Sequence, residues 1–584
     1  MFITQKVLAG IEWQAFERLI ARLLIHQGYK GVRVVGGSGD EGADIVAESP
    51  TQRRWLVQAK FWRKPVSQQE LRKTLEAAKK YRAACSVVVG LNGFDHQARE
   101  FQKEAMHQSH HLTLWSALDL LRQAAALNDK RPVRTAQGNY QKEAIDLITH
   151  ALVQRTPKRF AVVMATGLGK TFTTAAALQR FRGSKEGRVL VLAHTNSLVL
   201  QLEKAFWGFL SPAETTAVWN QSEKPNEPLL QSVDFLFATR DSVANYIKAG
   251  GILPHFDVII IDECHHAHSK SVAYQSILSH VRAGDSDGPQ LVGLTATPFL
   301  EDPAADLRPV FGETPLLTID MIYGLRNGFL AEVDYRLFTD NIDWNSVSRL
   351  SGKALSPMGV NRSFFIKEWD DAVVGHIQET WHTVQDPKVL VFCSNIEHSL
   401  MMRDKINARG FCSAEAIYSG SARGRKMSLY ERNLILADFE SGRYQVLCTV
   451  DIFNEGIDVP LINIVVFNRV THSRRIFIQQ LGRGLRVVAG KKTKAIVLDF
   501  AQDIRRYAAG IKLKDELSRP VPGTVVTLGH RVEFRNASGE DVRAEAFLRA
   551  WLDDVERIET AGDDEVGVLK FPPALFNAGQ GSTK

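Results

Sequence analysis

Residues 165–171 read Ala-Thr-Gly-Leu-Gly-Lys-Thr, between a run of apolar residues and a stretch with helical spacing. In such a strand-loop-helix context, glycines let backbone amides wrap a phosphate, and the helix N-terminus adds positive potential. We therefore expect Lys170 to reach the β and γ phosphates of a nucleotide and Thr171 to hold Mg²⁺. Ala165 stands where the full GxxxxGK[ST] pattern has its first glycine, so the interpretation depends on partner motifs elsewhere. The rest of the phosphate cradle is assigned to Thr166, Gly167 and Gly169.

Short apolar runs alternate with helical stretches around this motif and far beyond it. Such runs are typical of buried parallel strands. The first series lies at residues 160–164, 189–192, 235–237, 258–261 and 291–294. The second lies at residues 389–392, 446–448, 464–467 and 495–498. The sequence therefore predicts an α/β protein with two open parallel sheets, one after the other.

An acidic pair, Asp262-Glu263, ends one of the runs of the first series. Ligands of open α/β sheets sit at the carboxyl edge, where these side chains would lie. Asp262 suits Mg²⁺, and Glu263 suits a general base for an attacking water. An acidic pair after a strand is more often a solvated turn, but the upstream phosphate loop favours the catalytic interpretation.

An arginine-containing segment in the second series reads Gln479-Gln-Leu-Gly-Arg483-Gly-Leu-Arg486 and opens a predicted helix. Spaced arginines at this place can cross a cleft and stabilise charge on a γ phosphate. A basic solvated helix face is the alternative.

In this order, the motifs resemble the superfamily 2 helicases, in particular the DEAD/DEAH-like motors of type I and type III restriction enzymes. The resemblance covers roughly residues 140–500 and implies two RecA-like lobes that hydrolyse ATP with Mg²⁺. It further implies that Gln141, Gly456, Asp458 and Gln479 contact the nucleotide. By the same resemblance, the strand path is lined by His194, Thr195, Thr239, Ser394 and Thr449, although each alone is more often a turn residue or helix cap.

A second ordered constellation lies near the N-terminus and resembles the Mrr-type restriction endonuclease domain. It contains Glu17 on a helix, Asp44, and the Gln58-Ala-Lys60 end of an apolar run. The resemblance implies that Asp44 holds Mg²⁺, and that Lys60 orients the attacking water. Gln58 takes the place of the strand-borne acid two residues before that lysine, where it is a weaker ligand than a carboxylate, and Glu17 is a further metal or water contact. Asp40 is more often a loop-shaping residue. A nuclease fold kept only for DNA binding is the alternative.

These motifs suggest four segments. They are 1–125 (nuclease domain), 130–318 (first RecA-like lobe), 319–506 (second RecA-like lobe) and 507–584 (a small C-terminal extension of open role).

Composition sets broad bounds for the 584-residue chain. A formal net charge of +7 mildly favours a polyanionic partner. The five cysteines form no CxxC pair, which argues for a reducing compartment rather than a zinc or disulfide framework. No apolar run approaches the roughly 20 residues of a membrane span, so we expect a cytoplasmic protein without a membrane partner.

The two constellations together predict an ATP-dependent DNA helicase or translocase with a Mg²⁺-dependent endonuclease, acting in restriction or defence against foreign DNA. A DNA-stimulated ATPase with a non-cleaving first domain is the main alternative. An RNA helicase is a further one. Partner proteins of a defence system are possible from the resemblance, and the oligomeric state stays open.

Overall fold

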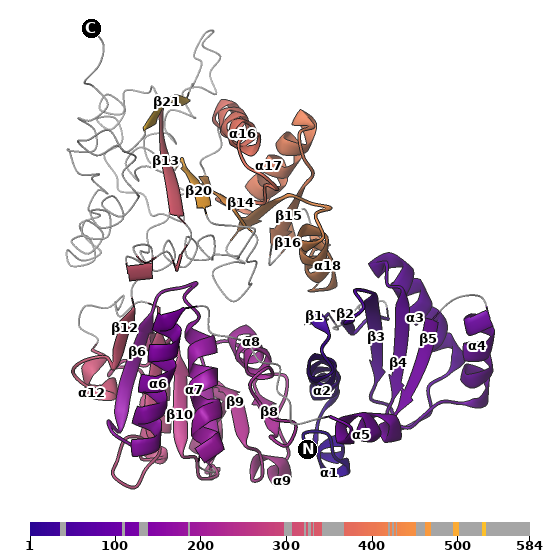
Figure 1. The fold of residues 1–584 in the computed structure, drawn as a ribbon, viewed down its shortest axis with the longest axis vertical. Helices are drawn as coiled ribbons and strands as arrows, with labels where there is room; N and C mark the ends of the chain where they lie inside the picture. The colour runs from indigo at the N-terminus through magenta and orange to yellow at the C-terminus, as the bar shows by residue number, and fades with distance from the viewer. Residues whose placement is uncertain are drawn as a thin grey trace.

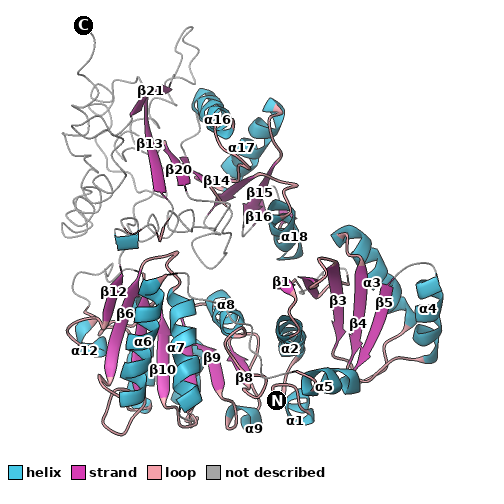
Figure 2. Ribbon diagram, in the orientation of Figure 1, coloured by secondary structure: helices cyan, strands magenta, loops and turns pink. Residues whose placement is uncertain are grey.

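The computed structural model describes three successive units, each built on its own β-sheet (Figures 1 and 2). The described residues are 1–35, 42–107, 111–127, 138–184, 187–296, 306–319, 323–324, 327, 329–330, 332–340, 367–418, 421–422, 425–427, 429–450, 462–468, 494–500 and 528–532. Seven residues singled out above and most of the proposed C-terminal extension lie outside them; the residues are Asp40, Gly456, Asp458, Gln479, Arg483 and Arg486, together with Gln480 of the arginine segment.

The N-terminal domain, α1 to α5, is a five-stranded sheet with helices on both faces. Its sheet order is β1-β2-β3-β4-β5, antiparallel from β1 to β3 and parallel from β3 to β5. Its strands are β1 (Lys30–Val34), β2 (Ile45–Glu48), β3 (Arg54–Lys60), β4 (Cys85–Gly90) and β5 (His111–Ser116). Its helices are α1 (Gln5–Gly10), α2 (Trp13–His26), α3 (Gln68–Tyr81), α4 (His96–His107) and α5 (Ala117–Ala125).

The side chains of β4 alternate between the two faces of the sheet, which explains why helices pack on both faces of this domain. Val87 and Val89 belong to the cluster formed with α2 and α5, whereas Val88 belongs to the cluster formed with α3 and α4. Successive strand side chains point to opposite faces, so one apolar strand supports both helical layers.

Lobe 1, α6 to β12, is a seven-stranded parallel sheet in the order β12-β6-β11-β10-β7-β9-β8. Its strands are β6 (Arg159–Met164), β7 (Val189–Ala193), β8 (Thr216–Trp219), β9 (Phe235–Thr239), β10 (Val258–Asp262), β11 (Gln290–Thr295) and β12 (Leu317–Ile319). Its helices are α6 (Asn139–Gln154), α7 (Lys170–Ser184), α8 (Asn196–Phe206), α9 (Glu227–Leu230), α10 (Arg240–Lys248), η1 (Cys264–His266), α11 (Val272–His280) and α12 (Arg308–Phe311). All five predicted strands of the first series are confirmed.

Lobe 2, β13 to β20, is a second mainly parallel sheet in the order β15-β18-β14-β19-β20-β13, and β21 (Leu528–Val532) pairs antiparallel with β13. Its strands are β13 (Glu332–Asp340), β14 (Val389–Cys393), β15 (Ala414–Tyr418), β18 (Val446–Val450), β19 (Ile464–Asn468) and β20 (Lys494–Asp499). Two further strands of lobe 2, β16 (Ser421–Ala422) and β17 (Arg425–Lys426), pair with each other in a separate antiparallel sheet. Its helices are α16 (Lys367–Trp381), α17 (Ile396–Arg409) and α18 (Leu429–Glu440). The four predicted strands of the second series are confirmed, and so is the α/β class.

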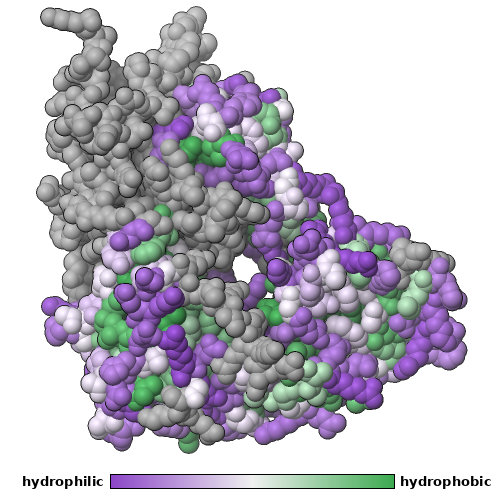
Figure 3. All heavy atoms as spheres, in the orientation of Figure 1, coloured by the Kyte–Doolittle hydropathy of each residue, from purple (hydrophilic) through white to green (hydrophobic). Residues whose placement is uncertain are grey.

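The outer surface of the described residues is mixed in polarity. On the face drawn in Figure 3, apolar residues are scattered among hydrophilic ones over the N-terminal domain and lobe 1. Within the part of the chain that the structure describes, no helix combines the length and the apolar character needed to cross a bilayer.

Candidate active sites

The loop between β6 and α7 has the backbone geometry of a phosphate cradle. Gly167 and Gly169 have φ values of 93° and 88°, a region that side chains other than glycine rarely adopt. Lys170 and Thr171 form the first turn of α7, where free backbone N–H groups point out of the helix. A Cβ atom at Gly169 would lie 2.6 Å from Nε2 of Gln141, so the loop fits against that side chain only with glycine.

Gln141 lies against this loop, as the sequence predicts for a residue near the nucleotide. Its Nε2 donates to the carbonyl oxygen of Leu168 at 2.9 Å, and the hydroxyl of Tyr140 donates to the same oxygen at 3.0 Å. Gln141 is buried. In this structure it therefore supports the phosphate loop directly.

Lys170 joins the loop to the acidic pair at the end of β10. Its Nζ lies 3.2 Å from Oδ1 of Asp262 and 3.0 Å from Oε1 of Glu263. Burial disfavours the charged ammonium, but the two carboxylates outweigh it and raise the pKa of Lys170. The structure thus brings together the three side chains that the sequence assigns to phosphate, metal and water.

Glu263 adopts a left-handed backbone conformation, with φ 49° and ψ 53°. For a residue with a Cβ this costs about 1–2 kcal/mol. Such strain is found where a side chain is held in a particular direction at a functional site. Here it aims Glu263 at Lys170 and places Cys264–His266 in a short helical turn behind it.

The residues assigned to the strand path differ in exposure. His194 is half-buried, with its ring centroid 4.1 Å from that of His266, and Thr195 is the N-cap of α8. Ser394 Oγ lies 2.8 Å from Nδ1 of His398. Thr239 caps α10, and both it and Thr449 are buried, so neither hydroxyl reaches the surface in this conformation.

Asp44 lies directly before β2, against the neighbouring strand β3. Its backbone N–H donates to the carbonyl of Val57 at 3.0 Å, and its Oδ2 accepts from the backbone N–H of Ala59 at 2.6 Å. Ala59 stands between Gln58 and Lys60. Strand pairing therefore brings Asp44 to the segment that carries the other two nuclease candidates. Glu17 is buried on α2, which packs against both strands.

Helix α3 supplies the polar partners of Gln58 and Lys60. The hydroxyl of Thr74 donates to Oε1 of the buried Gln58. Nζ of Lys60 lies 3.1 Å from Oε2 of Glu70, whose Oε1 is 2.7 Å from Nζ of Lys73. Burial opposes ionisation of Glu70, but Lys73 and Lys60 together lower its pKa.

Glu70 is the residue that sequence reasoning missed. It stands ten positions after Lys60 and belongs to no spacing motif, so only the packing of α3 on β3 brings the two together.

Three segments of the chain match families of known proteins. Residues 8–123 match the family described as "Restriction endonuclease". Residues 136–300 match "Type III restriction enzyme, res subunit", and residues 371–488 match "Helicase conserved C-terminal domain".

Two curated relatives each align with somewhat less than two thirds of the chain. A Schizosaccharomyces pombe protein assigned as the mitochondrial ATP-dependent helicase irc3 is 28% identical, over 63% of this chain and 58% of its own length. The type I restriction enzyme EcoAI endonuclease subunit of Escherichia coli is 26% identical, over 63% of this chain and 46% of its own length. The chain thus spans about half the length of the curated relatives it matches.

Solved structures give lower identities. The ATP-dependent type ISP restriction-modification enzyme LlaBIII, bound to DNA, is 19% identical with a TM-score of 0.47, covering 86% of this chain and 38% of that one. The helicase domain of Hef from Pyrococcus furiosus is 19% identical with a TM-score of 0.42, covering 62% of this chain and 95% of that one.

The family matches follow the order of the three sheets, and each matched family consists of enzymes or enzyme domains. On these matches, the chain carries a restriction endonuclease domain, followed by a domain of the type III restriction enzyme res subunit and by a helicase conserved C-terminal domain.

Proposed function

We propose that this protein is an ATP-driven DNA translocase or helicase whose N-terminal domain cuts DNA with Mg²⁺, in restriction or another defence against foreign DNA. The observation that carries the proposal is the presence of two assembled polar sites in one chain. One joins Lys170 to Asp262 and Glu263, and the other joins Asp44 to the Gln58–Lys60 strand.

In the motor site, ATP binding would exchange the partners of Lys170. The ammonium group now neutralises two carboxylates. When it moves to the β and γ phosphates, Asp262 becomes free for Mg²⁺ and Glu263 for the attacking water. Bound Mg²⁺ supplies charge neutralisation on the phosphates. The arginines of the 479–486 segment are proposed to reach the γ phosphate from lobe 2.

In the nuclease site, the donor set suits a hard cation. Asp44 offers a buried carboxylate, one oxygen of which accepts the backbone N–H of Ala59 on β3, and carboxylate oxygens are the ligands that Mg²⁺ prefers. Mg²⁺ held there would polarise the scissile phosphate. Lys60, fixed by Glu70, is the group proposed to orient the water, with Gln58 beside it and Glu17 below on α2.

The test is cleavage of supercoiled plasmid with Mg²⁺, with and without ATP, by wild type, Lys60→Ala and Lys170→Ala. We expect wild type to cut, Lys60→Ala not to cut, and Lys170→Ala to lose the ATP-dependent part. Equal nicking by wild type and Lys60→Ala would assign the activity to a contaminant and refute the nuclease role.

A non-cleaving, DNA-stimulated ATPase is the second candidate. One observation favours it: the buried Gln58, which accepts a hydrogen bond from Thr74, would bring no charge to a metal at this site. On that reading nothing cuts, while DNA-stimulated ATP hydrolysis persists until Lys170 is changed. Stimulation by matched DNA and RNA separates both candidates from an RNA helicase.

A further inference from the structure

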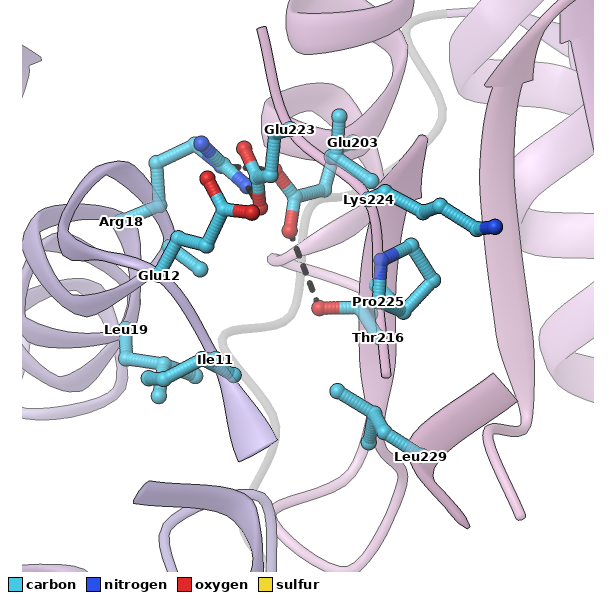
Figure 4. A pocket seen from close by; sticks show the side chains of 13 residues that line it. Ile11, Glu12, Arg18, Leu19, Glu203, Thr216, Glu223, Lys224, Pro225 and Leu229 are labelled. Atoms are coloured by element: carbon cyan, nitrogen blue, oxygen red, sulfur yellow. Dashed lines mark hydrogen bonds and ion pairs between the residues drawn. The ribbon is translucent and has the colours of Figure 1, made fainter. Parts of the chain in front are cut away.

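The N-terminal domain is joined to lobe 1 through a buried ion cluster. On α2, Arg18 donates from Nε to Oε2 of Glu203 at 2.7 Å and from Nη2 to Oε1 of Glu223 at 2.6 Å. Figure 4 shows the three side chains converging from the two units, with Thr216 donating to Glu203 at 3.0 Å. All three charged groups are buried. A buried ion cluster keeps its geometry, because separating it leaves charges unpaired.

Apolar and backbone contacts extend this interface. Trp207, at the end of α8, is buried in the hydrophobic cluster of the N-terminal domain, together with Phe2 and Phe16. The fully buried Arg22 donates from Nη2 to the carbonyl oxygens of Ser211 and Glu214, both at 2.9 Å. The two units therefore share one core.

The same interface is tied to the two helices that begin at the motor's ligand sites. Helix α8 starts at the N-cap Thr195, proposed to face nucleic acid, and ends about 16 Å away at the shared core. Helix α7 starts at Lys170, and near its end Arg182 donates to Oε1 of Glu214 at 3.0 Å. The nuclease domain is thus attached at the far end of α8, and through Glu214, whose carbonyl oxygen accepts from Arg22, it is linked to the far end of α7.

Lobe 2 touches the N-terminal domain through a smaller contact. Leu434 of α18 packs, half-buried, on the cluster that contains Val35, Ala43 and Val46. Arg33 of β1 forms an ion pair with Glu440, at the end of α18, and both side chains are partly exposed. Ala43 directly precedes Asp44, so this contact lies beside the proposed nuclease site.

We propose that the nuclease domain and lobe 1 move as one body, and that the α18 contact opens and closes with the ATP cycle and thereby gates DNA cleavage. The unequal interfaces carry this inference: a small, exposed contact yields before a buried ionic and apolar one. The proposal that the α18 contact gates cleavage rests on the proposed function. The proposal that the nuclease domain and lobe 1 move together does not.

Distance measurements test the movement without any need for cleavage. Lys103, Val272 and Glu379 are exposed residues of the N-terminal domain, lobe 1 and lobe 2, respectively. Cysteines at these sites, in a full-length Cys412→Ser chain, accept fluorophores, because the other four cysteines are buried. On addition of DNA, Mg²⁺ and a non-hydrolysable ATP analogue, we expect the 103–379 distance to change and the 103–272 distance to stay constant. Equal changes, or none in either pair, would overturn the proposal.

Exchanging the charges of Arg33 and Glu440 tests whether the α18 contact controls DNA cleavage. Arg33→Glu and Glu440→Arg each place like charges at the α18 contact, and the double variant restores an opposite pair. We expect each single variant to alter ATP-dependent cleavage about threefold to fivefold, the range of a partly exposed ion pair, and the double variant to recover it. DNA-stimulated ATP hydrolysis should be unchanged in all three. Cleavage insensitive to all variants would refute gating, whereas absence of cleavage in wild type would refute the proposed function instead.

Discussion

Gly169 is the residue at which the phosphate loop is most restricted. Its φ of 88° strains any residue that has a Cβ atom, and an added Cβ atom would lie 2.6 Å from Nε2 of Gln141, so that this amide would have to move. We expect Gly169→Ala to lower DNA-stimulated ATP hydrolysis about tenfold or more, since roughly 1.4 kcal/mol of strain in the loop corresponds to that factor. Steady-state hydrolysis rates measure this. Gly183→Ala is the control, because its added Cβ meets nothing within 4 Å. Equal rates for the two variants would contradict the prediction.

Glu70 is expected to hold Lys60 in position for cleavage. Glu70→Gln removes the charge that fixes the ammonium, so we predict a tenfold to hundredfold fall in kcat, roughly the effect of losing a supporting contact. DNA affinity and thermal stability should stay at the wild-type level. Lys73→Met is the matched control, because it removes the more exposed partner of the same carboxylate. If Lys73→Met is as damaging as Glu70→Gln, the carboxylate acts in another way.

The sequence alone predicts some residues of each candidate site but misses others, because only some of them lie within short motifs. Lys170 with Thr171, and Gln58 with Lys60, lie within short motifs, where backbone geometry alone fixes their relation. Glu70, by contrast, reaches Lys60 only through packing of α3 on β3. Contacts that depend on tertiary packing produce no characteristic residue spacing, so they cannot be predicted from a sequence motif.

At the scale of elements, the strands that consist of continuous apolar runs were predictable, whereas the mixed strands β8, β13 and β15 were not. The nine predicted strands are continuous apolar runs buried on both faces. Strands β8 and β15 stand at the edges of their sheets, and both are short, mixed segments, Thr216–Trp219 and Ala414–Tyr418. Both strands are largely buried, but the polar residues Thr216 and Glu415 shorten their apolar runs, so their sequences carry a weaker signal.

Helix α2 is expected to make the N-terminal domain sensitive to acid through His26. Burial, reinforced by Arg22, lowers the pKa of this histidine to about 3. The unfolded chain binds the proton near pH 6.5, so stability is full above that pH and falls as the pH decreases from about 6.5 towards 3. The slope is at most about 1.4 kcal/mol per pH unit. Denaturant unfolding of wild type and His26→Gln from pH 8 to pH 4 measures it. A wild-type slope no steeper than that of the variant would contradict the assignment.

At the scale of the whole molecule, the family order predicted three units but not how they are joined. Arg18 lies 185 positions before Glu203 and 205 positions before Glu223 in the sequence. From the sequence alone, each of the three is predicted to be an ordinary, solvent-exposed charged residue of a helix or loop. Only the docked structure turns them into one buried cluster.

Arg18→Met therefore tests the joint between the nuclease domain and lobe 1. It leaves two carboxylates buried without their cation, so we expect a loss of about 3–5 kcal/mol and faster hydrogen exchange in α2 and α8, with α16 unchanged. The triple variant Arg18→Met, Glu203→Gln, Glu223→Gln removes the charges together and should recover most of the loss.

The pH dependence of the Arg18→Met variant separates lost charge compensation from lost packing. Burial already raises the pKa of Glu223, against the pull of Arg18. Without the guanidinium, the folded-state pKa of Glu223 rises further above its unfolded value of about 4.3, so the folded state binds the proton more tightly. The penalty is then largest above the raised pKa and shrinks as the pH falls towards the unfolded value. Hydrogen exchange and unfolding at pH 8 and pH 5 should therefore show the defect narrowing at the lower pH. A defect of constant size would mean that the side chain of Arg18 stabilises the joint by its packing alone.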